Sequence, residues 1–181
     1  MKILGIDPGS RATGYAVLEL SSTGVAFLEG GVLPMAPGSP FTERLGAIGE
    51  GLELLVGRCR PDESAVEDLF HALNSRSALR LAHARGVILG VLARARLPIS
   101  EYTPLQVKKA VSGYGFAEKD GLRILIERIL SIPRGTLTRD ASDAVAVALC
   151  HAQALPLRRA VTAAEKTPAQ KYAPGRRGGF R

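Results

Sequence analysis

Four carboxylates stand where a folded domain could gather them into one reactive site. Asp7 follows a short apolar run and precedes a Pro-Gly pair, and Glu67 follows a second short apolar run. Asp140 and Asp143 are three residues apart at the start of an apolar segment, so a helix there would direct both to the same side. Each acid taken alone has an ordinary explanation, as a turn former, a solvated strand end or a partner of the helix dipole.

The four acids become informative together, because two strand ends and one helix start can converge on one point of a compact domain. Unneutralised carboxylates at that point would repel one another, which raises the pKa of some of them unless a divalent cation binds. Oxygen ligands without Cys or His favour Mg²⁺, with Mn²⁺ as a substitute. Two such ions roughly 4 Å apart can activate water and stabilise the leaving oxygen during phosphodiester cleavage. Asp68, next to Glu67, is expected to point to the opposite face of its strand.

The elements that must position these acids follow from the hydrophobic pattern and from the Pro and Gly residues that interrupt it. The first three strands form an antiparallel meander, and the alternation of strands and helices afterwards implies a parallel half of the sheet. We therefore expect an α/β domain with a mixed five-stranded sheet flanked by helices. The expected strands are 2–7, 14–20, 25–33, 64–67 and 99–102, and the expected helices are 41–59, 75–96, 104–112, 118–130 and 139–154.

The composition is that of one ordinary globular domain, with 181 residues of which 46% are hydrophobic and 23% charged. The two cysteines, Cys59 and Cys150, lie far apart and form neither a disulfide framework nor a CxxC metal pair. No apolar run reaches the roughly 18 residues of a membrane span. We expect no membrane association and a location in the reducing cytoplasm.

The basic balance is concentrated at the carboxyl end of the chain. The net charge is +7, which suggests a polyanionic partner. Residues 156–181 contain seven Lys and Arg against one Glu, whereas residues 1–155 contain 17 basic and 16 acidic residues. The sequence therefore predicts a nearly neutral domain over 1–155, followed over 156–181 by a basic tail that is too poor in large apolar residues to fold.

Four segments resemble the RuvC family of bacterial Holliday junction resolvases, in the family's usual order and spacing. The resemblance covers about residues 1–155. It implies a ribonuclease H-like fold and a homodimer that makes paired symmetric nicks in four-way DNA junctions with Mg²⁺, in recombination and DNA repair, alongside the RuvA and RuvB branch-migration proteins. The segments are GIDPGSRATGYAV (5–17), AVEDLFHALNSRSALRLAHARGV (65–87), EYTPLQVKKAVSGYGFAEK (101–119) and RDASDAVAVALCH (139–151).

The resemblance also assigns roles to residues. It implies that Asp7, Glu67, Asp140 and Asp143 are the catalytic, metal-binding carboxylates; some relatives carry His where Asp140 stands. Phe70 would be an aromatic wedge that stacks on bases at the strand-exchange point, where stacking contributes about 1–3 kcal/mol. Its ordinary alternative is a core phenylalanine.

Basic residues complete the expected DNA contacts. Lys108 falls at a family position that contacts phosphate, and the adjacent Lys109 could make the same kind of contact. Lys119 falls at a position that could approach the scissile phosphate and stabilise developing charge. The ordinary alternative for Lys108 and Lys119 is that they are solvated surface lysines, as most lysines are. Arg76, Arg80 and Arg85 lie near one helical stripe and either follow the DNA backbone or solvate the helix.

Other readings of the sequence remain. The segment DPGSRATG also resembles the first phosphate motif of actin-like and sugar-kinase ATPases, but those proteins need a second domain that 181 residues do not hold. A non-catalytic DNA-binding protein and a nuclease acting on RNA or flaps stay open. His71, His83 and His151 form no catalytic or metal pattern, and the expected long helix 75–96 is the candidate dimer interface.

Overall fold

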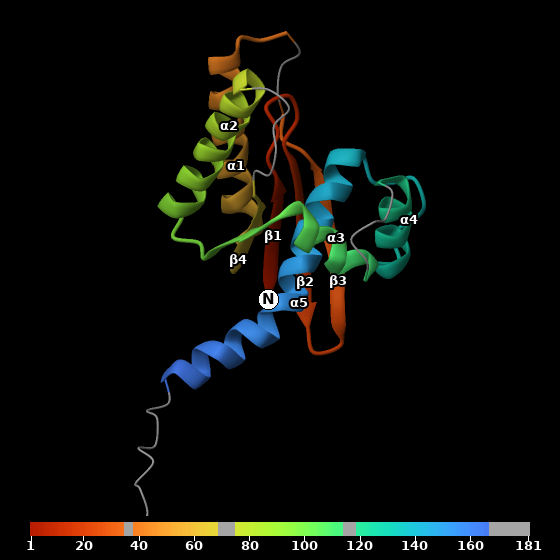
Figure 1. Cartoon of the computed structure of the whole chain (residues 1–181). Coiled ribbons are helices and arrows are strands. Elements are labelled where there is room, and N and C mark those ends of the chain that lie inside the picture. Colours follow the sequence, from red (N-terminus) through yellow and green to blue (C-terminus); the bar gives the residue numbers. More distant parts are fainter. Residues whose placement is uncertain (35–37, 69–74, 114–118, 167–181) are drawn as a thin grey trace, which may run out of the picture.

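A five-stranded mixed sheet forms the centre of the computed structural model, which describes residues 1–34, 38–68, 75–113 and 119–166. The strand order is β3-β2-β1-β4-β5. β1 pairs antiparallel with β2 and parallel with β4, which itself pairs parallel with β5 (Figure 1). The predicted α/β class and mixed sheet are confirmed. The strands are β1 (Lys2–Asp7), β2 (Gly14–Ser21), β3 (Gly24–Val32), β4 (Glu63–Glu67) and β5 (Ile99–Tyr102).

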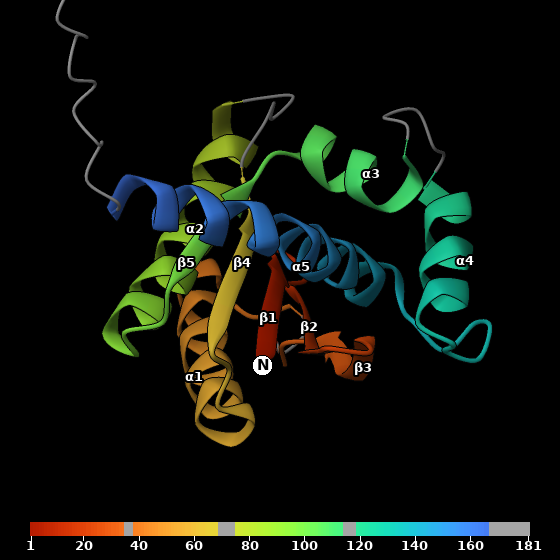
Figure 2. The same ribbon diagram turned by 90° about the horizontal axis from the view of Figure 1, so that it is seen from below.

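Helices cover both faces of this sheet, as Figure 2 shows. One face packs against α1 (Phe41–Cys59) and α2 (Ser75–Arg94), and the other packs mainly against α5 (Arg139–Lys166). Two shorter helices, α3 (Pro104–Ser112) and α4 (Lys119–Ile129), pack beside α5. Among the described helices, none is long and apolar enough to cross a lipid bilayer.

The alternation of side chains along β1 decides which face each strand residue serves. Leu4 and Ile6 belong to the core beneath α1 and α2, whereas Ile3 belongs to the core beneath α5. By the same alternation, Asp7 at the end of β1 lies on the α5 face. Glu67 at the end of β4 lies there too, because Ala65 packs in the α5 core and Val66 in the other.

Helix α3 begins at a sharply defined position because its amino end is capped. Thr103 is the N-cap: its hydroxyl accepts from the backbone N–H of Gln106, and the Gln106 side chain accepts from the backbone N–H of Thr103. Pro104 occupies the first turn, where its missing N–H costs nothing, and Gly113 ends the helix with a positive φ of 73°. Since Thr103 directly follows β5, this cap fixes α3 to the edge of the sheet.

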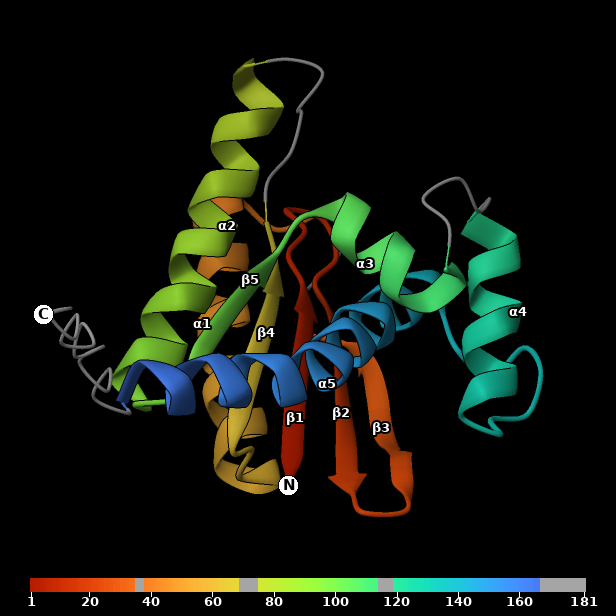
Figure 3. The same cartoon turned by 60° about the horizontal axis from the view of Figure 1, so that its bottom comes forward.

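Helix α5 is longer than the sequence predicted. The prediction ended it near Ala154, ahead of Pro156 and a segment poor in large apolar residues, but the helix continues through Pro156 to Lys166. Pro156 has no backbone N–H, so it cannot donate to the carbonyl of Ala152 one turn earlier, and its own side chain is exposed. Figure 3 shows α5 crossing the sheet and then extending past its edge. The remainder of the predicted tail, 167–181, lies outside the described residues.

Candidate active site

Asp7 and Glu67 meet at the carboxyl edge of the sheet because β1 and β4 are adjacent and parallel. Ile6 and Val66 are register partners, so the next residue on each strand carries a carboxyl group at the same edge and on the same face. The two carboxyl groups are hydrogen-bonded to each other. Such a bond requires a proton on one of them, since an ionised carboxylate only accepts.

Helix α5 brings Asp140 and Asp143 to this pair across a floor of two glycines. A Cβ at Gly14 would lie 2.0 Å from the backbone oxygen of Asp140, and a Cβ at Gly5 would lie 2.4 Å from the backbone oxygen of Ala144. Both distances are far below a van der Waals contact. The absence of a side chain at these two positions therefore lets the first turns of α5 approach the sheet beside Asp7.

The pKa of Asp7 reports this crowding of acids. Burial, followed by the charge and hydrogen bond of Glu67 and then by the charges of Asp143 and Asp140, raises the pKa of Asp7 from 3.8 to about 8. Without a counter-charge, the site therefore holds a proton at neutral pH. A cation bound among these oxygens would displace that proton.

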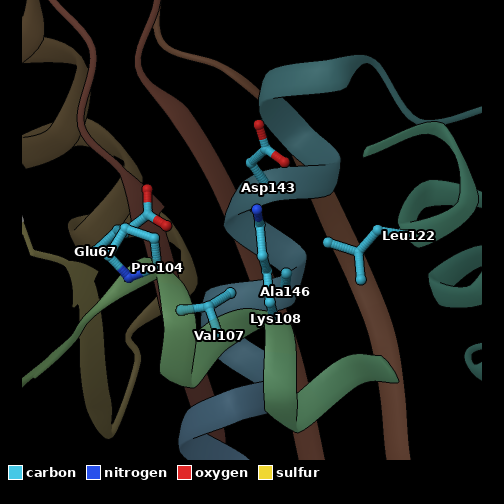
Figure 4. A pocket seen from close by; sticks show the side chains of 7 residues that line it. All are labelled: Glu67, Pro104, Val107, Lys108, Leu122, Asp143 and Ala146. Carbon is cyan, nitrogen blue, oxygen red and sulfur yellow. The ribbon is translucent and has the colours of Figure 1, made fainter. Parts of the chain in front are cut away.

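A pocket of about 190 Å³ opens between two of these carboxylates and helix α3. Glu67 and Asp143 lie on its walls, and Lys108 extends into it from α3 with its ammonium group pointing toward Asp143 (Figure 4). The apolar part of the lining comes from Pro104, Val107, Leu122 and Ala146. Acidic oxygens beside one ammonium group form a site suited to a phosphate with its metal counter-ions.

The loop that leads into α5 is held by a buried carboxylate that the sequence analysis missed. Glu127 on α4 is only 3% exposed and accepts from the backbone N–H groups of Gly135 (3.0 Å) and Leu137 (3.4 Å). Thr138 then accepts from the N–H of Ala141 in the first turn of α5. Glu127 therefore fixes where α5 begins. An isolated Glu in an amphipathic helix gives no sequence signal of such a role.

The donor set fits a hard divalent cation, because it consists of carboxylate oxygens alone. Among the described residues, no group of three or more His, Cys, Asp or Glu side chains lies close enough together to hold a metal ion. Bare carboxylates repel one another, so a cation is needed to draw them into one coordination shell.

The other predicted site residues fall into two groups. Lys109, Arg76 and Arg80 are exposed, and the Arg80 guanidinium lies 5.6 Å from the centre of the Phe41 ring. Phe70, together with His71, lies outside the described residues. Lys119 is the first residue of α4, and its side chain also lies outside the described part of the chain.

Arg85 is the exception among the arginines, because the interpretation that it follows DNA or solvates its helix is wrong. Its side chain is only 15% exposed and forms ion pairs with Asp68, at 3.2 Å, and with Glu101. Strand alternation turns both acids away from the α5 face and toward α2, which confirms the predicted orientation of Asp68. Arg85 therefore ties α2 to the ends of β4 and β5.

Comparisons with known proteins agree with this architecture. Residues 3–151 match the family model described as crossover junction endodeoxyribonuclease RuvC. The protein of that name from Desulforamulus reducens is 44% identical over 153 residues, which cover 84% of this chain and 94% of the relative. The counterpart from Geobacter sulfurreducens is 42% identical over 158 residues, covering 87% and 96%.

Solved structures show the same likeness. Thermus thermophilus RuvC in complex with a Holliday junction substrate superposes with a TM-score of 0.80 at 31% identity, covering 87% of this chain and 96% of that one. The yeast mitochondrial Holliday junction resolvase Ydc2 shares the fold alone, with a TM-score of 0.52 at 13% identity over 90% of this chain and 85% of that one.

Proposed function

This chain belongs to the crossover junction endodeoxyribonuclease RuvC family, and we propose that its carboxylate edge is where it hydrolyses the phosphodiester bonds of four-way DNA junctions. It is a Holliday junction resolvase of recombination and DNA repair, with the α/β ribonuclease H-like fold. The observation that carries the proposed site is the convergence of four carboxyl groups where β1, β4 and α5 meet, which also raises the pKa of Asp7. Because its substrate is DNA, we infer that the protein acts in the cytoplasm.

We infer that Asp7, Glu67, Asp140 and Asp143 together hold Mg²⁺, with Mn²⁺ as a substitute, and that two ions bind in each active site. When bound, the two ions would activate a water molecule and stabilise the leaving oxygen. The four carboxylates orient the cations and give up the proton that Asp7 holds in the metal-free protein. Strand β1 and the first turns of α5 hold the backbones of these residues in place, so binding of the cations requires only their side chains to move.

The basic residues contribute in two ways. Lys108 shares the pocket with Glu67 and Asp143, so we assign it to the scissile phosphate, where its charge strengthens binding of the developing negative charge. Lys119 is assigned the same task from the start of α4, on the family resemblance. Lys109, Arg76 and Arg80 contact phosphates farther from the cut, which raises affinity without affecting chemistry. Phe70 is assigned to stacking on unpaired bases, again on the resemblance.

Paired nicks in opposite strands require two active sites, so we propose a homodimer whose twofold axis matches that of the junction. The face supporting this is a groove of about 670 Å³ between α1 and α2, lined by four glycines at positions 46, 49, 86 and 90. Small residues allow two helices to approach closely. RuvA and RuvB are further partners that the family resemblance implies.

The dimer proposal has a direct test. Gly86→Arg places charge and bulk in this groove, and sedimentation at micromolar concentration should then give a monomer where the unaltered protein gives a dimer. Gly57→Arg, at an open position of α1 outside the groove, is the matched control and should remain dimeric. A monomeric unaltered protein would contradict the proposal.

We assign the nuclease domain to residues 1–155 and a role in non-specific attraction of DNA to the basic residues beyond it. The activity itself is tested by cleavage of a mobile four-way junction beside duplex, flap and RNA–DNA hybrid substrates, with and without Mg²⁺. Symmetric nicks in the junction alone, only with the metal, support the proposed function. Equal rates on all substrates would favour a general nuclease, and binding without nicking would favour a non-catalytic DNA-binding protein.

A further inference from the structure

A buried histidine on α5 links both strands at the parallel edge of the sheet. His151 is 0% exposed. Its Nδ1 lies 2.8 Å from the hydroxyl of Tyr102 on β5, and its Nε2 lies 2.8 Å from a carboxylate oxygen of Glu63 on β4. A carboxylate accepts, so Nε2–H donates to Glu63, and in the neutral ring Nδ1 accepts from the Tyr102 hydroxyl. Both ring nitrogens are therefore bonded, which fixes the orientation of the imidazole.

Two of these residues are linked to Glu67 through the backbone of the sheet, Tyr102 by strand pairing and Glu63 by lying on the same strand. Tyr102 is the register partner of Glu67 in the β4–β5 pair, and the backbone N–H of Asp68 donates to the Tyr102 carbonyl at 2.8 Å. Glu63 begins the strand that Glu67 ends, and alternation places both on the α5 face. A displacement of Tyr102 or Glu63 relative to α5 is therefore also a displacement of Glu67.

The third residue is connected to Asp143. His151 stands eight residues farther along α5, about 12 Å away along a continuous helix. Nearer to Asp143, α5 packs on β1 through residues without polar side chains, with Ala144 and Ala148 lying against Gly5. Apolar contacts favour burial without preferring one direction. The hydrogen bonds of His151 are directional, so they help to set where α5 lies along the sheet.

We propose that Glu63, His151 and Tyr102 form a positioning network that fixes the spacing between Glu67 on β4 and Asp143 on α5, and with it the metal-binding geometry of the pocket. This inference rests on the proposed function of these two carboxylates. The network also reaches Lys108, because Thr103, which caps α3, directly follows Tyr102. A change of about 1 Å in the position of reacting groups is enough to reduce a rate roughly 100-fold.

The test uses the full chain with Tyr102→Phe, which removes the hydroxyl and keeps the packed ring. Single-turnover nicking at saturating protein should slow roughly tenfold or more, and the Mg²⁺ concentration for half-maximal rate should rise, while junction affinity measured without metal stays within about twofold. His151→Gln should cause the same losses, because it also breaks the bond to Tyr102. The variant that combines both substitutions should be no slower than either single variant, since each of the three lacks the same hydrogen bond between Tyr102 and His151.

Two controls separate positioning from stability. Leu52→Ala removes a fully buried side chain of α1 beneath the opposite sheet face, so it lowers the unfolding temperature without touching the network. At a temperature where every variant is folded, it should keep the normal rate and Mg²⁺ requirement. Glu63→Gln, whose amide oxygen still accepts from Nε2–H, should retain most of the activity.

The outcomes are distinguishable from failure of the proposed function. If Tyr102→Phe keeps the rate and the Mg²⁺ dependence of the unaltered protein, or if Leu52→Ala reproduces its losses, the positioning network is wrong while the nuclease assignment stands. Calorimetric titration with Mg²⁺ alone gives a second readout, in which Tyr102→Phe should bind the metal more weakly than the unaltered protein. An unaltered protein that neither nicks junctions nor binds Mg²⁺ would overturn both proposals.

Discussion

Gly14 is the antiparallel register partner of Asp7, and the backbone of Asp140 lies directly over it. Gly14 thus lies next to Asp7, whose pKa is raised, and beneath the start of the helix that carries Asp140 and Asp143. The position has no room for a side chain. The approach of Asp140 and Asp143 to Asp7 therefore depends on the absence of a side chain at Gly14.

Gly14→Ala should abolish most nicking while leaving the fold intact. The added Cβ would stand 2.0 Å from the Asp140 backbone oxygen, so the first turn of α5 must move away from Asp7. We expect a rate loss on the order of 100-fold, measured in single turnover at saturating protein. Gly57→Ala, at an exposed helical position with nothing within 4 Å, is the matched control and should keep full activity. Equal rates for the two variants would contradict the role of the glycine floor.

Asp7→Asn should bind four-way junctions and fail to nick them with Mg²⁺. The amide keeps the shape of the side chain but removes a negative ligand from the proposed metal site. Affinity without metal should be unchanged, because Asp7 holds a proton at neutral pH and the substitution removes no charge. Gel-shift and cleavage assays on the same preparation check both halves. Unaltered cleavage would remove Asp7 from the active site.

Stability without metal should fall as pH rises from about 4 to about 8. The pKa of Asp7 is 3.8 in the unfolded chain and about 8 in the folded one, so the folded state binds more protons in this window. The contribution of Asp7 is complete below the lower value and lost above the upper one, with a slope of up to about 1.4 kcal/mol per pH unit. Chemical denaturation across this range in chelator measures it.

The same linkage predicts that Mg²⁺ stabilises the protein more at pH 8 than at pH 6, because the metal no longer competes with a proton. Asp7→Asn has no group to titrate at this position, so its stability should depend less on pH than that of the unaltered protein. A steeper dependence in the variant would show that another group controls the effect.

Lys108→Ala should lose far more rate than Lys109→Ala. Lys108 lines the pocket beside Glu67 and Asp143, whereas the neighbouring Lys109 is exposed on α3. Loss of a charge at the reacting phosphate costs about 100-fold or more in rate, while loss of a distant phosphate contact weakens binding and lowers its salt dependence by about one unit of slope. Similar rate losses in both variants at saturating protein would place both lysines outside the chemistry.

Truncation after Lys166 should weaken non-specific DNA affinity and leave nicking intact. Residues 167–181 contain four Lys and Arg and no acid. If each neutralises one phosphate, the slope of log affinity against log salt falls by up to roughly 3.6. Titrations at several salt concentrations measure this slope. Loss of nicking at saturating protein would show that the tail does more than attract DNA.

Much of the site could be predicted because it depends on local patterns. Asp7 and Glu67 each follow an apolar strand, and adjacent parallel strands place their carboxyl ends at one edge. The i,i+3 spacing of Asp140 and Asp143 puts both on one side of any helix. The antiparallel meander and the parallel half of the sheet were predicted from the succession of strands and helices, and both are confirmed.

The rest depends on partners that only the folded chain brings together. His151 is bonded to residues 49 and 88 positions away, and Arg85 pairs with acids on two different strands. No periodicity along the chain encodes such contacts. Glu127 bonds backbone groups rather than side chains, so its partners carry no residue signature. The length of α5 was missed because an exposed proline interrupts a helix less than the pattern suggests.

Because α5 extends to Lys166, one helix both carries active-site acids at its start and sets the position of the chain beyond the sheet at its end. Its first turns carry Asp140 and Asp143, and its last turn ends at Lys166 beyond the sheet. Each residue of an α-helix turns the chain by about 100°, so a single insertion after Leu155 would rotate the outer part by that angle and leave the acids where they are. The direction in which the carboxyl end leaves the domain is therefore set by the number of residues in this helix as much as by their identity.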